Sequence, residues 1–172
     1  MIRQEDKLVL GCAAKEYLRQ LSVIWTSSLS DYNRVVASNQ FPLPVLGYLM
    51  WTQQWLVMEL KQIDRVVHKI VVESGGRHPC NSKALLYMPR CKGGRGLRSV
   101  EMEYKATKIM GAARIHGNED PALGMVPEFE EQAARMGRRS NFKEAAKCAE
   151  ELGLELDLEQ RKGLRRRVEN HY

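Results

Sequence analysis

The sequence predicts an all-α protein: a helical bundle with a Gly/Arg-rich loop and a helical C-terminal tail. Between residues 5 and 73, apolar side chains recur every three or four positions, which is the period of an amphipathic helix. Serine, proline and paired glycines separate the segments that carry this period, as is typical of helix ends. We find no internal repeat and no set of alternating segments that would predict a β-sheet.

The first two expected helices meet at a serine–aspartate step. Apolar residues at helical spacing cover residues 5–29. Ser30 and Asp31 then break this helix and supply the N-cap of the second. Pro42 and Pro44 must end or kink the second helix, because each lacks an N–H group and clashes with the preceding turn.

The third expected helix, residues 52–73, has the clearest amphipathic pattern, and Gly75 and Gly76 stop it. An aromatic stripe, Tyr48, Trp51 and Trp55, lies around its start. Rings at this spacing can stack on unpaired bases, but they more often belong to a hydrophobic core. We interpret the stripe, and Trp25 with it, as core.

Downstream of this helix the sequence predicts mostly loop as far as Arg98, with a short helical turn over residues 81–86. Ser99 is a suitable N-cap, and Glu101 lies in the first turn, where the helix dipole favours an anion. A helix is therefore expected over residues 100–115.

Residues 117–126 are expected to be a linker, because they contain glycine, asparagine, aspartate and proline. The linker divides the chain into a helical domain, residues 1–116, and a charged helical tail, residues 127–172. In the tail, Asn141 with Glu144 resembles a capping pair, and a further helix is expected to run to the end of the chain.

Composition limits the class of protein. The chain has 172 residues with 27 lysines and arginines against 21 aspartates and glutamates, a net charge of +6. This balance favours nucleic acid or another polyanion as partner. The sequence has no apolar run that could span a bilayer and no secretory signal, so we expect no membrane partner and an intracellular location, nuclear or cytoplasmic. The four dispersed cysteines indicate free thiols in a reducing compartment, without the spacing of a zinc site.

The most informative segment is residues 87–97, Tyr-Met-Pro-Arg-Cys-Lys-Gly-Gly-Arg-Gly-Leu. It places Arg90, Lys92 and Arg95 among Gly93, Gly94 and Gly96. Glycine accepts positive φ, and adjacent exposed N–H groups can form an anion-binding concavity to which the cations add charge. The segment is a phosphate-binding loop on this interpretation. The alternative is a surface turn with solvated cations, since short glycine motifs are unspecific.

Motifs of enzymes are missing from the sequence. It has no nucleotide P-loop, no His-Glu-x-x-His and no Gly-x-Ser-x-Gly. It also lacks a close pair of aspartates for two-metal phosphoryl transfer. His68 has no visible partner for acid–base work, so we interpret it as a structural or surface histidine.

Several blocks occur in an order that matches one family. They are Glu16–Arg19, then Ser28-Leu29 with Asn33, Ala37 and Asn39, then Pro44–Leu46 with Tyr48, the set Trp55, Glu59-Leu60, Ile63-Asp64-Arg65 and Lys69, then His78-Pro79, Leu86–Arg90, Gly93–Leu97 and Val100-Glu101. Together they resemble the thumb and downstream connector of a reverse transcriptase from a non-LTR (LINE-type) retrotransposon. The resemblance covers about residues 15–105.

The resemblance implies a thumb-like helical module that holds a template–primer duplex behind a polymerase active site. Members of the family are RNA-directed DNA polymerases. Their palm carries a Tyr/Phe-Ala-Asp-Asp signature that holds metal ions, and this signature is not in the present sequence. We therefore expect no cofactor and no catalysis by this chain alone. Mg²⁺ would belong to the missing palm, which a separate polypeptide could supply as a partner. The chain is expected to be a fragment of a longer polymerase or a domesticated remnant.

Two groups of residues are expected to bind RNA, DNA or an RNA–DNA hybrid. In the loop they are Arg90, Lys92, Arg95 and Arg98 on phosphate, with Gly93, Gly94 and Gly96 allowing close backbone approach. In the third helix they are Lys61, Arg65 and Lys69, which lie about one turn apart along one cationic edge. Such contacts position a duplex and carry little sequence information.

Two other functions stay open. One is a domesticated retroelement-derived domain that binds another protein through an apolar groove near Trp51 and Trp55. The other is an independent enzyme, which would need a perturbed acid or nucleophile in a pocket.

Overall fold

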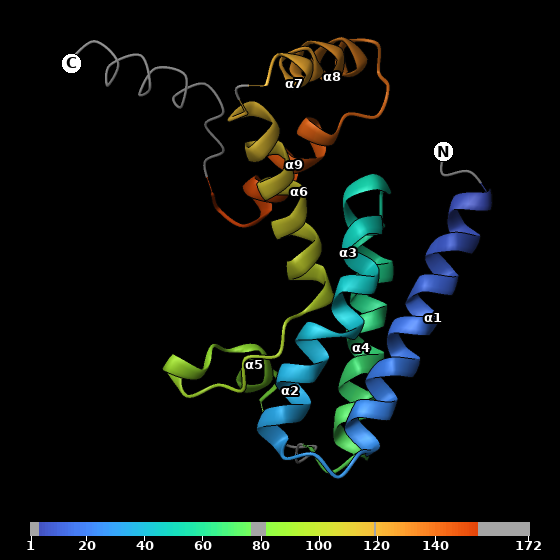
Figure 1. Ribbon diagram of the computed structural model, residues 1–172, viewed down its shortest axis with the longest axis vertical. Coiled ribbons are helices and arrows are strands. Elements are labelled where there is room, and N and C mark those ends of the chain that lie inside the picture. The colour runs from blue at the N-terminus through green and yellow to red at the C-terminus, as the bar shows by residue number, and fades with distance from the viewer. Residues whose placement is uncertain (1–3, 77–81, 119, 155–172) are drawn as a thin grey trace. The chain divides into compact units, whose positions relative to one another are not determined.

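The computed structural model describes residues 4–76, 82–118 and 120–154. The protein is all-α: every regular element in these ranges is a helix, as predicted (Figure 1). The chain divides into two compact units, Met1–Tyr104 and Lys105–Tyr172. Each unit is described by itself.

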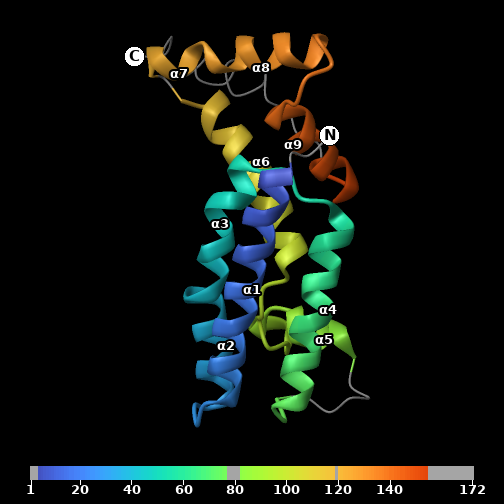
Figure 2. The same ribbon diagram turned by 90° about the vertical axis from the view of Figure 1, so that its right-hand side faces the viewer.

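The first unit is a helical bundle. In it α1 (Gln4–Thr26) packs against α3 (Pro42–Thr52) and α4 (Val57–Glu73), and α2 (Asp31–Gln40) packs against α1 and α3. Figures 1 and 2 show α1, α3 and α4 running alongside one another. The largest fully buried apolar and aromatic side chains of the first unit are Tyr17, Leu21, Trp25, Val35, Leu46, Met50, Leu60, Val67, Val71, Leu86 and Tyr104. They form the core that fixes these helices against each other.

Helix ends in the first unit follow the sequence signals. The Ser30 hydroxyl accepts a hydrogen bond from the N–H of Asn33 at 3.4 Å, so Ser30 is the predicted N-cap of α2. Pro42 begins α3, where its missing N–H leaves no helical bond unmade. The second expected helix is therefore two helices. At the end of α4, Gly75 has a φ of 67° and Gly76 donates to the carbonyl of Val71, a glycine C-cap as expected.

The aromatic stripe is only partly core. Trp25 and Trp55 are buried, and the indole N–H of Trp25 donates to the Ser38 hydroxyl at 3.0 Å. Trp51 is half-buried. Tyr48 is 75% exposed, so its assignment to the core is wrong. The reason is rotational: α3 turns Leu46 and Met50 into the bundle, which leaves Tyr48 on the opposite side of the helix.

In the second unit, α6 (Val100–His116), which begins in the first unit, continues from Lys105 and is held to α9 (Asn141–Glu151) by buried charges. The Lys105 ammonium lies 3.0 Å from the Glu151 carboxylate. Lys108, which is 1% exposed, lies 3.1 Å from Glu144 and donates to the Asn141 side-chain oxygen at 3.1 Å. Each ammonium is thus paired, which a buried charge requires.

Two details of the second unit differ from the expectation. Residues 121–124, expected within a linker, form the short helix α7 (Pro121–Gly124), which α8 (Val126–Arg135) follows. Ser140 rather than Asn141 caps α9, because the Ser140 hydroxyl accepts from the N–H of Lys143. Asn141 turns its side chain to Lys108 instead. The helix expected at the end of the chain lies outside the described residues.

None of the helices in the described ranges combines the length and the apolar character needed to cross a bilayer.

The start of α6 is anchored to the side of α4 by Asp64. Its carboxylate accepts hydrogen bonds from the Ser99 hydroxyl at 2.6 Å, the Val100 N–H at 2.9 Å and the Glu101 N–H at 3.2 Å. The Ser99 hydroxyl in turn accepts from the N–H of Met102 at 3.4 Å, which agrees with its prediction as N-cap. An anion at this position also meets the positive end of the helix dipole.

Replacing Asp64 by alanine should lower the free energy of unfolding by about 1–3 kcal/mol, because the first N–H groups of α6 lose a charged acceptor. Asp64→Asn keeps one acceptor oxygen and should lose less. Urea denaturation followed by circular dichroism measures both. Equal stability of Asp64→Ala and the parent would contradict the role of this carboxylate.

Candidate nucleic-acid interface

The Gly/Arg-rich loop is a compact segment of the first unit. It begins with α5 (Lys83–Tyr87) and the 3-10 turn η1 (Arg90–Lys92), and it reaches α6 through Gly93–Ser99. Tyr87, the last residue of α5, packs edge-on against His68 of α4, with ring centroids 5.2 Å apart. His68 therefore has a packing role.

The backbone N–H groups from Lys92 to Leu97, which include those of the three glycines, are paired within the segment itself. Successive donors and acceptors are Lys92 to Pro89 (3.0 Å), Gly93 to Arg90 (2.9 Å), Gly94 to Pro89 (3.1 Å), Arg95 to Leu85 (2.9 Å), Gly96 to Met88 (2.9 Å) and Leu97 to Leu86 (3.0 Å). The expected concavity of free N–H groups for an anion is therefore not formed. The reason is that the chain folds back on α5 and closes its own hydrogen bonds.

The three glycines are required by the shape of the loop. Gly93 and Gly96 have φ angles of 82° and 77°, in the left-handed region that side chains disfavour. At Gly94 a Cβ atom would lie 2.0 Å from the carbonyl oxygen of Met88. The backbone path thus accounts for all three positions without any ligand.

Side chains from α2 hold the loop in place. The Asn39 amide donates to the Gly96 carbonyl at 2.9 Å, and its oxygen accepts from the Arg98 N–H at 3.0 Å. The guanidinium of Arg95 donates to the Asp31 carboxylate and to the Gly76 carbonyl. Together with the Asp64 anchor, these contacts fix the loop against both α2 and α4.

Arg95 is thus engaged inside the protein. Its side chain is 28% exposed and its charge is balanced by Asp31. The sequence does not reveal this ion pair. Asp31 is already accounted for by its position at the start of a helix, so no distant partner is expected for it. Asn39 is among the residues that carry the family resemblance. Tyr32 of α2, whose ring contacts Arg90, is not, and the sequence gives no reason to expect that contact.

The other three cations of the loop lie at the surface. Arg90 donates to the Arg95 carbonyl at 3.1 Å, and its guanidinium lies 4.2 Å from the centre of the Tyr32 ring, a cation–π contact. Lys92 is exposed. Arg98 is 60% exposed and lies 3.5 Å from the Glu103 carboxylate, an exposed pair that holds little energy. These guanidinium and ammonium groups are accessible to a polyanion.

The three cations of α4, Lys61, Arg65 and Lys69, are all exposed. Their spacing of four residues places them along one side of the helix, away from the buried Leu60 and Val67. Lys69 also lies 3.8 Å from Glu73, again at the surface.

Of the four cysteines, three lie in described parts of the chain, and all three are free, as predicted: Cys12 and Cys91 are exposed and Cys148 is buried. Burial raises the pKa of the Cys148 thiol. Cys91 lies between Arg90 and Lys92, so it marks the outer side of the loop. Within the described ranges, no group of three or more histidines, cysteines or carboxylates is placed to hold a metal ion.

The strongest shifts in pKa lie in α1. Burial raises the pKa of Tyr17, and the nearby Asp64 carboxylate adds to the effect. Hydrogen bonds from Arg19 and Gln20 lower the pKa of Glu16 to about 2. Neither Tyr17 nor Glu16 lines the pocket between α1, α2 and the end of α4 or the groove between α1 and α4.

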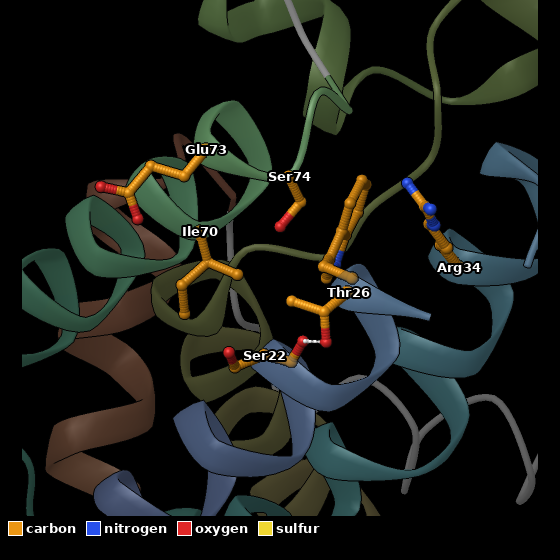
Figure 3. Close-up of a pocket in the computed structure, with 7 residues that line it drawn as sticks. Ser22, Thr26, Arg34, Ile70, Glu73 and Ser74 are labelled. Carbon is orange, nitrogen blue, oxygen red and sulfur yellow. Dashed lines mark hydrogen bonds between the residues drawn. The ribbon is translucent and has the colours of Figure 1, made fainter. Parts of the chain in front are cut away.

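A pocket of about 410 Å³ lies between α1, α2 and the end of α4. Its lining is Ser22, Trp25, Thr26, Arg34, Ile70, Glu73 and Ser74, and Figure 3 shows Glu73 and Arg34 on opposite sides of it. The Thr26 hydroxyl donates to the Ser22 carbonyl at 2.9 Å, and Arg34 donates to the Ser27 carbonyl at 2.6 Å. None of the predicted binding residues lines this pocket.

A second hollow, of about 270 Å³, is an apolar groove between α1 and α4. It is lined by Leu10, Gly11, Ala14, Leu18, Trp55, Glu59, Gln62, Ile63 and Val66. The indole N–H of Trp55 is buried and has no acceptor in the described part of the chain. On the protein-binding alternative, the sequence predicts an apolar groove near Trp51 and Trp55. Trp55 lines this groove, and Trp51 does not.

Comparisons with protein-family models, with curated proteins and with solved structures give no match to this chain. The likeness to retrotransposon reverse transcriptases therefore stays a prediction from the sequence blocks. Several residues of those blocks have a structural role, since Asn39, Asp64 and Arg95 hold the loop and the glycines shape it.

Arg95 and Lys92 should behave differently when replaced by alanine. Arg95→Ala should lower the free energy of unfolding by about 1–3 kcal/mol, because the Asp31 carboxylate and the Gly76 carbonyl lose their donor. Lys92→Ala should change it by less than about 0.5 kcal/mol, as is usual for an exposed side chain. Urea denaturation of both variants decides, and equal effects would contradict the distinction.

Proposed function

We propose that this chain is a helical module that binds nucleic acid, gripping an RNA–DNA duplex by its backbone without a polymerase active site of its own. The observation that supports this most is the Asp64 anchor, which brings the end of the loop against α4. Arg98 directly precedes the anchored Ser99, and Lys61 lies one helical turn before Asp64. The Asp64 anchor therefore joins the end of the cationic loop to α4, the helix that carries the second group of cations.

The cations assigned to phosphate are those that point outward: Arg90, Lys92 and Arg98 of the loop, and Lys61, Arg65 and Lys69 of α4. Arg95 and the three glycines are assigned to the structure of the loop and not to phosphate. A rigid display of cations suits a duplex, whose phosphates form a regular lattice, and such contacts fix orientation rather than sequence. Any catalysis would require a metal-binding palm, whose signature is not among these 172 residues.

The dependence of binding on salt tests the proposal. Fluorescence anisotropy with a labelled RNA–DNA hybrid should show log affinity falling linearly with log salt, because bound cations displace counterions from phosphate. The double variant Lys92→Ala/Arg98→Ala should reduce the slope by about 2, since each lost phosphate contact removes nearly one unit. Lys143→Ala/Lys147→Ala, on exposed positions of α9, is the matched control and should leave the slope unchanged.

The cysteines locate the contact independently. Alkylation of Cys91 should slow when the hybrid is bound, because this thiol lies between two of the proposed phosphate ligands, whereas exposed Cys12 should react at the same rate. Peptide mass spectrometry after timed labelling gives both rates. A salt slope unchanged in the loop variant, or an unprotected Cys91, would contradict the proposal.

A second candidate function has its own observation. The α1–α4 groove is apolar and lined by side chains such as Leu10, Ile63 and Trp55. Such a groove fits an amphipathic helix of a partner protein that fills it with apolar side chains. On this interpretation the chain binds protein and not the hybrid.

An apolar dye tests whether the groove is open to a ligand. Anilinonaphthalene sulfonate should fluoresce on the native protein, and Ala14→Glu, which places a negative charge in the groove and repels the anionic dye, should remove most of the signal. Val23→Glu, at an exposed position of the same helix, is the control. Dye binding unaffected by Ala14→Glu would count against this groove as a docking site.

A further inference from the structure

One side of α3 presents aromatic rings to solvent. Phe41, at the junction of α2 and α3, is 65% exposed, and Tyr48 is 75% exposed. They are seven residues apart, which is close to two helical turns, so both rings lie on the same side of the helix. Pro44, between them, is exposed as well. The bundle uses the opposite side of α3, so packing does not explain these rings.

The cationic loop is held close in the chain to the start of this aromatic side. Asn39 of α2 binds both the Gly96 carbonyl and the Arg98 N–H, and Phe41 follows two residues later. The loop therefore meets the end of α2 that leads into the first of the two rings. Residues 32–58 contain no aspartate or glutamate, so neither α3 nor most of α2 contributes a carboxylate that would repel a phosphate chain.

We propose that Phe41 and Tyr48 form a subsite that stacks unpaired bases of a single-stranded extension leaving the duplex. Exposed rings beside a cationic track are the means by which proteins hold single strands without reading sequence. Seven residues of helix span about 10 Å, the length of about three nucleotides at 3.4 Å each. The inference rests on the proposed duplex binding and adds a second ligand to it: unpaired nucleobases next to the gripped backbone.

Two hybrids with the same duplex, one blunt and one with a six-nucleotide single-stranded extension, test the subsite by anisotropy. The parent protein should bind the extended hybrid on the order of tenfold more tightly. Phe41→Leu/Tyr48→Leu keeps apolar volume but removes both rings, and it should bind the two hybrids equally, with blunt-duplex affinity unchanged. Phe129→Ala, at a 61% exposed ring of α8, should keep the preference.

A 2-aminopurine in the extension gives a direct signal of stacking. Its fluorescence should be quenched by the parent protein and recover with the leucine variant, whose folding is checked by its circular dichroism melting curve. Equal binding of both hybrids by the parent, or a preference retained by the leucine variant, would overturn the subsite while leaving duplex binding intact. Failure to bind either hybrid in a salt-dependent way would instead overturn the proposed function and the subsite with it.

Discussion

The carboxylate of Asp64 is the constraint on which the arrangement of the first unit depends. The first N–H groups of a helix have no acceptor within the helix, and here the Asp64 carboxylate of α4 accepts from those of Val100 and Glu101. Helix α6 therefore begins at a defined place on the bundle. The preceding loop then has a fixed end at Ser99, and Asn39 fixes it again a few residues earlier. A segment with three glycines is held rigidly by contacts outside itself.

Rigidity divides the loop's cations into two kinds. Arg95 reaches the Asp31 carboxylate and becomes part of the protein's own hydrogen bonding. Arg90, Lys92 and Arg98 have at most weak, solvent-exposed partners within the described ranges, and a polyanion can compete for them at little cost. The same residue type thus supports the fold or faces solvent according to whether a carboxylate lies within reach.

The sequence predicts helix ends well because caps are local. Ser30, Ser99 and Gly75 act within a few residues of themselves, so their roles follow from the neighbouring sequence. It predicts the site less well because the decisive contacts are distant. Arg95 and Asp31 are 64 residues apart, and periodicity does not reveal which side of α3 the bundle covers. The prediction for Tyr48 is wrong for that reason, and the prediction of open N–H groups in the loop is wrong because their acceptors in and beside α5 depend on how the chain folds back.

The blocks on which the retrotransposon resemblance is predicted include only half of the cations proposed to touch phosphate: Arg65, Lys69 and Arg90 belong to them, and Lys61, Lys92 and Arg98 do not. Gly93, Gly94 and Gly96, with Asp64 and Arg95, build the loop's shape, and a domain that had stopped binding nucleic acid would still need them to fold. The outward cations make only surface contacts: Arg90 with the Tyr32 ring and the Arg95 carbonyl, and Arg98 with Glu103. The glycine block therefore accounts for the geometry of the loop, whereas the proposal of binding depends on the charges which that geometry displays.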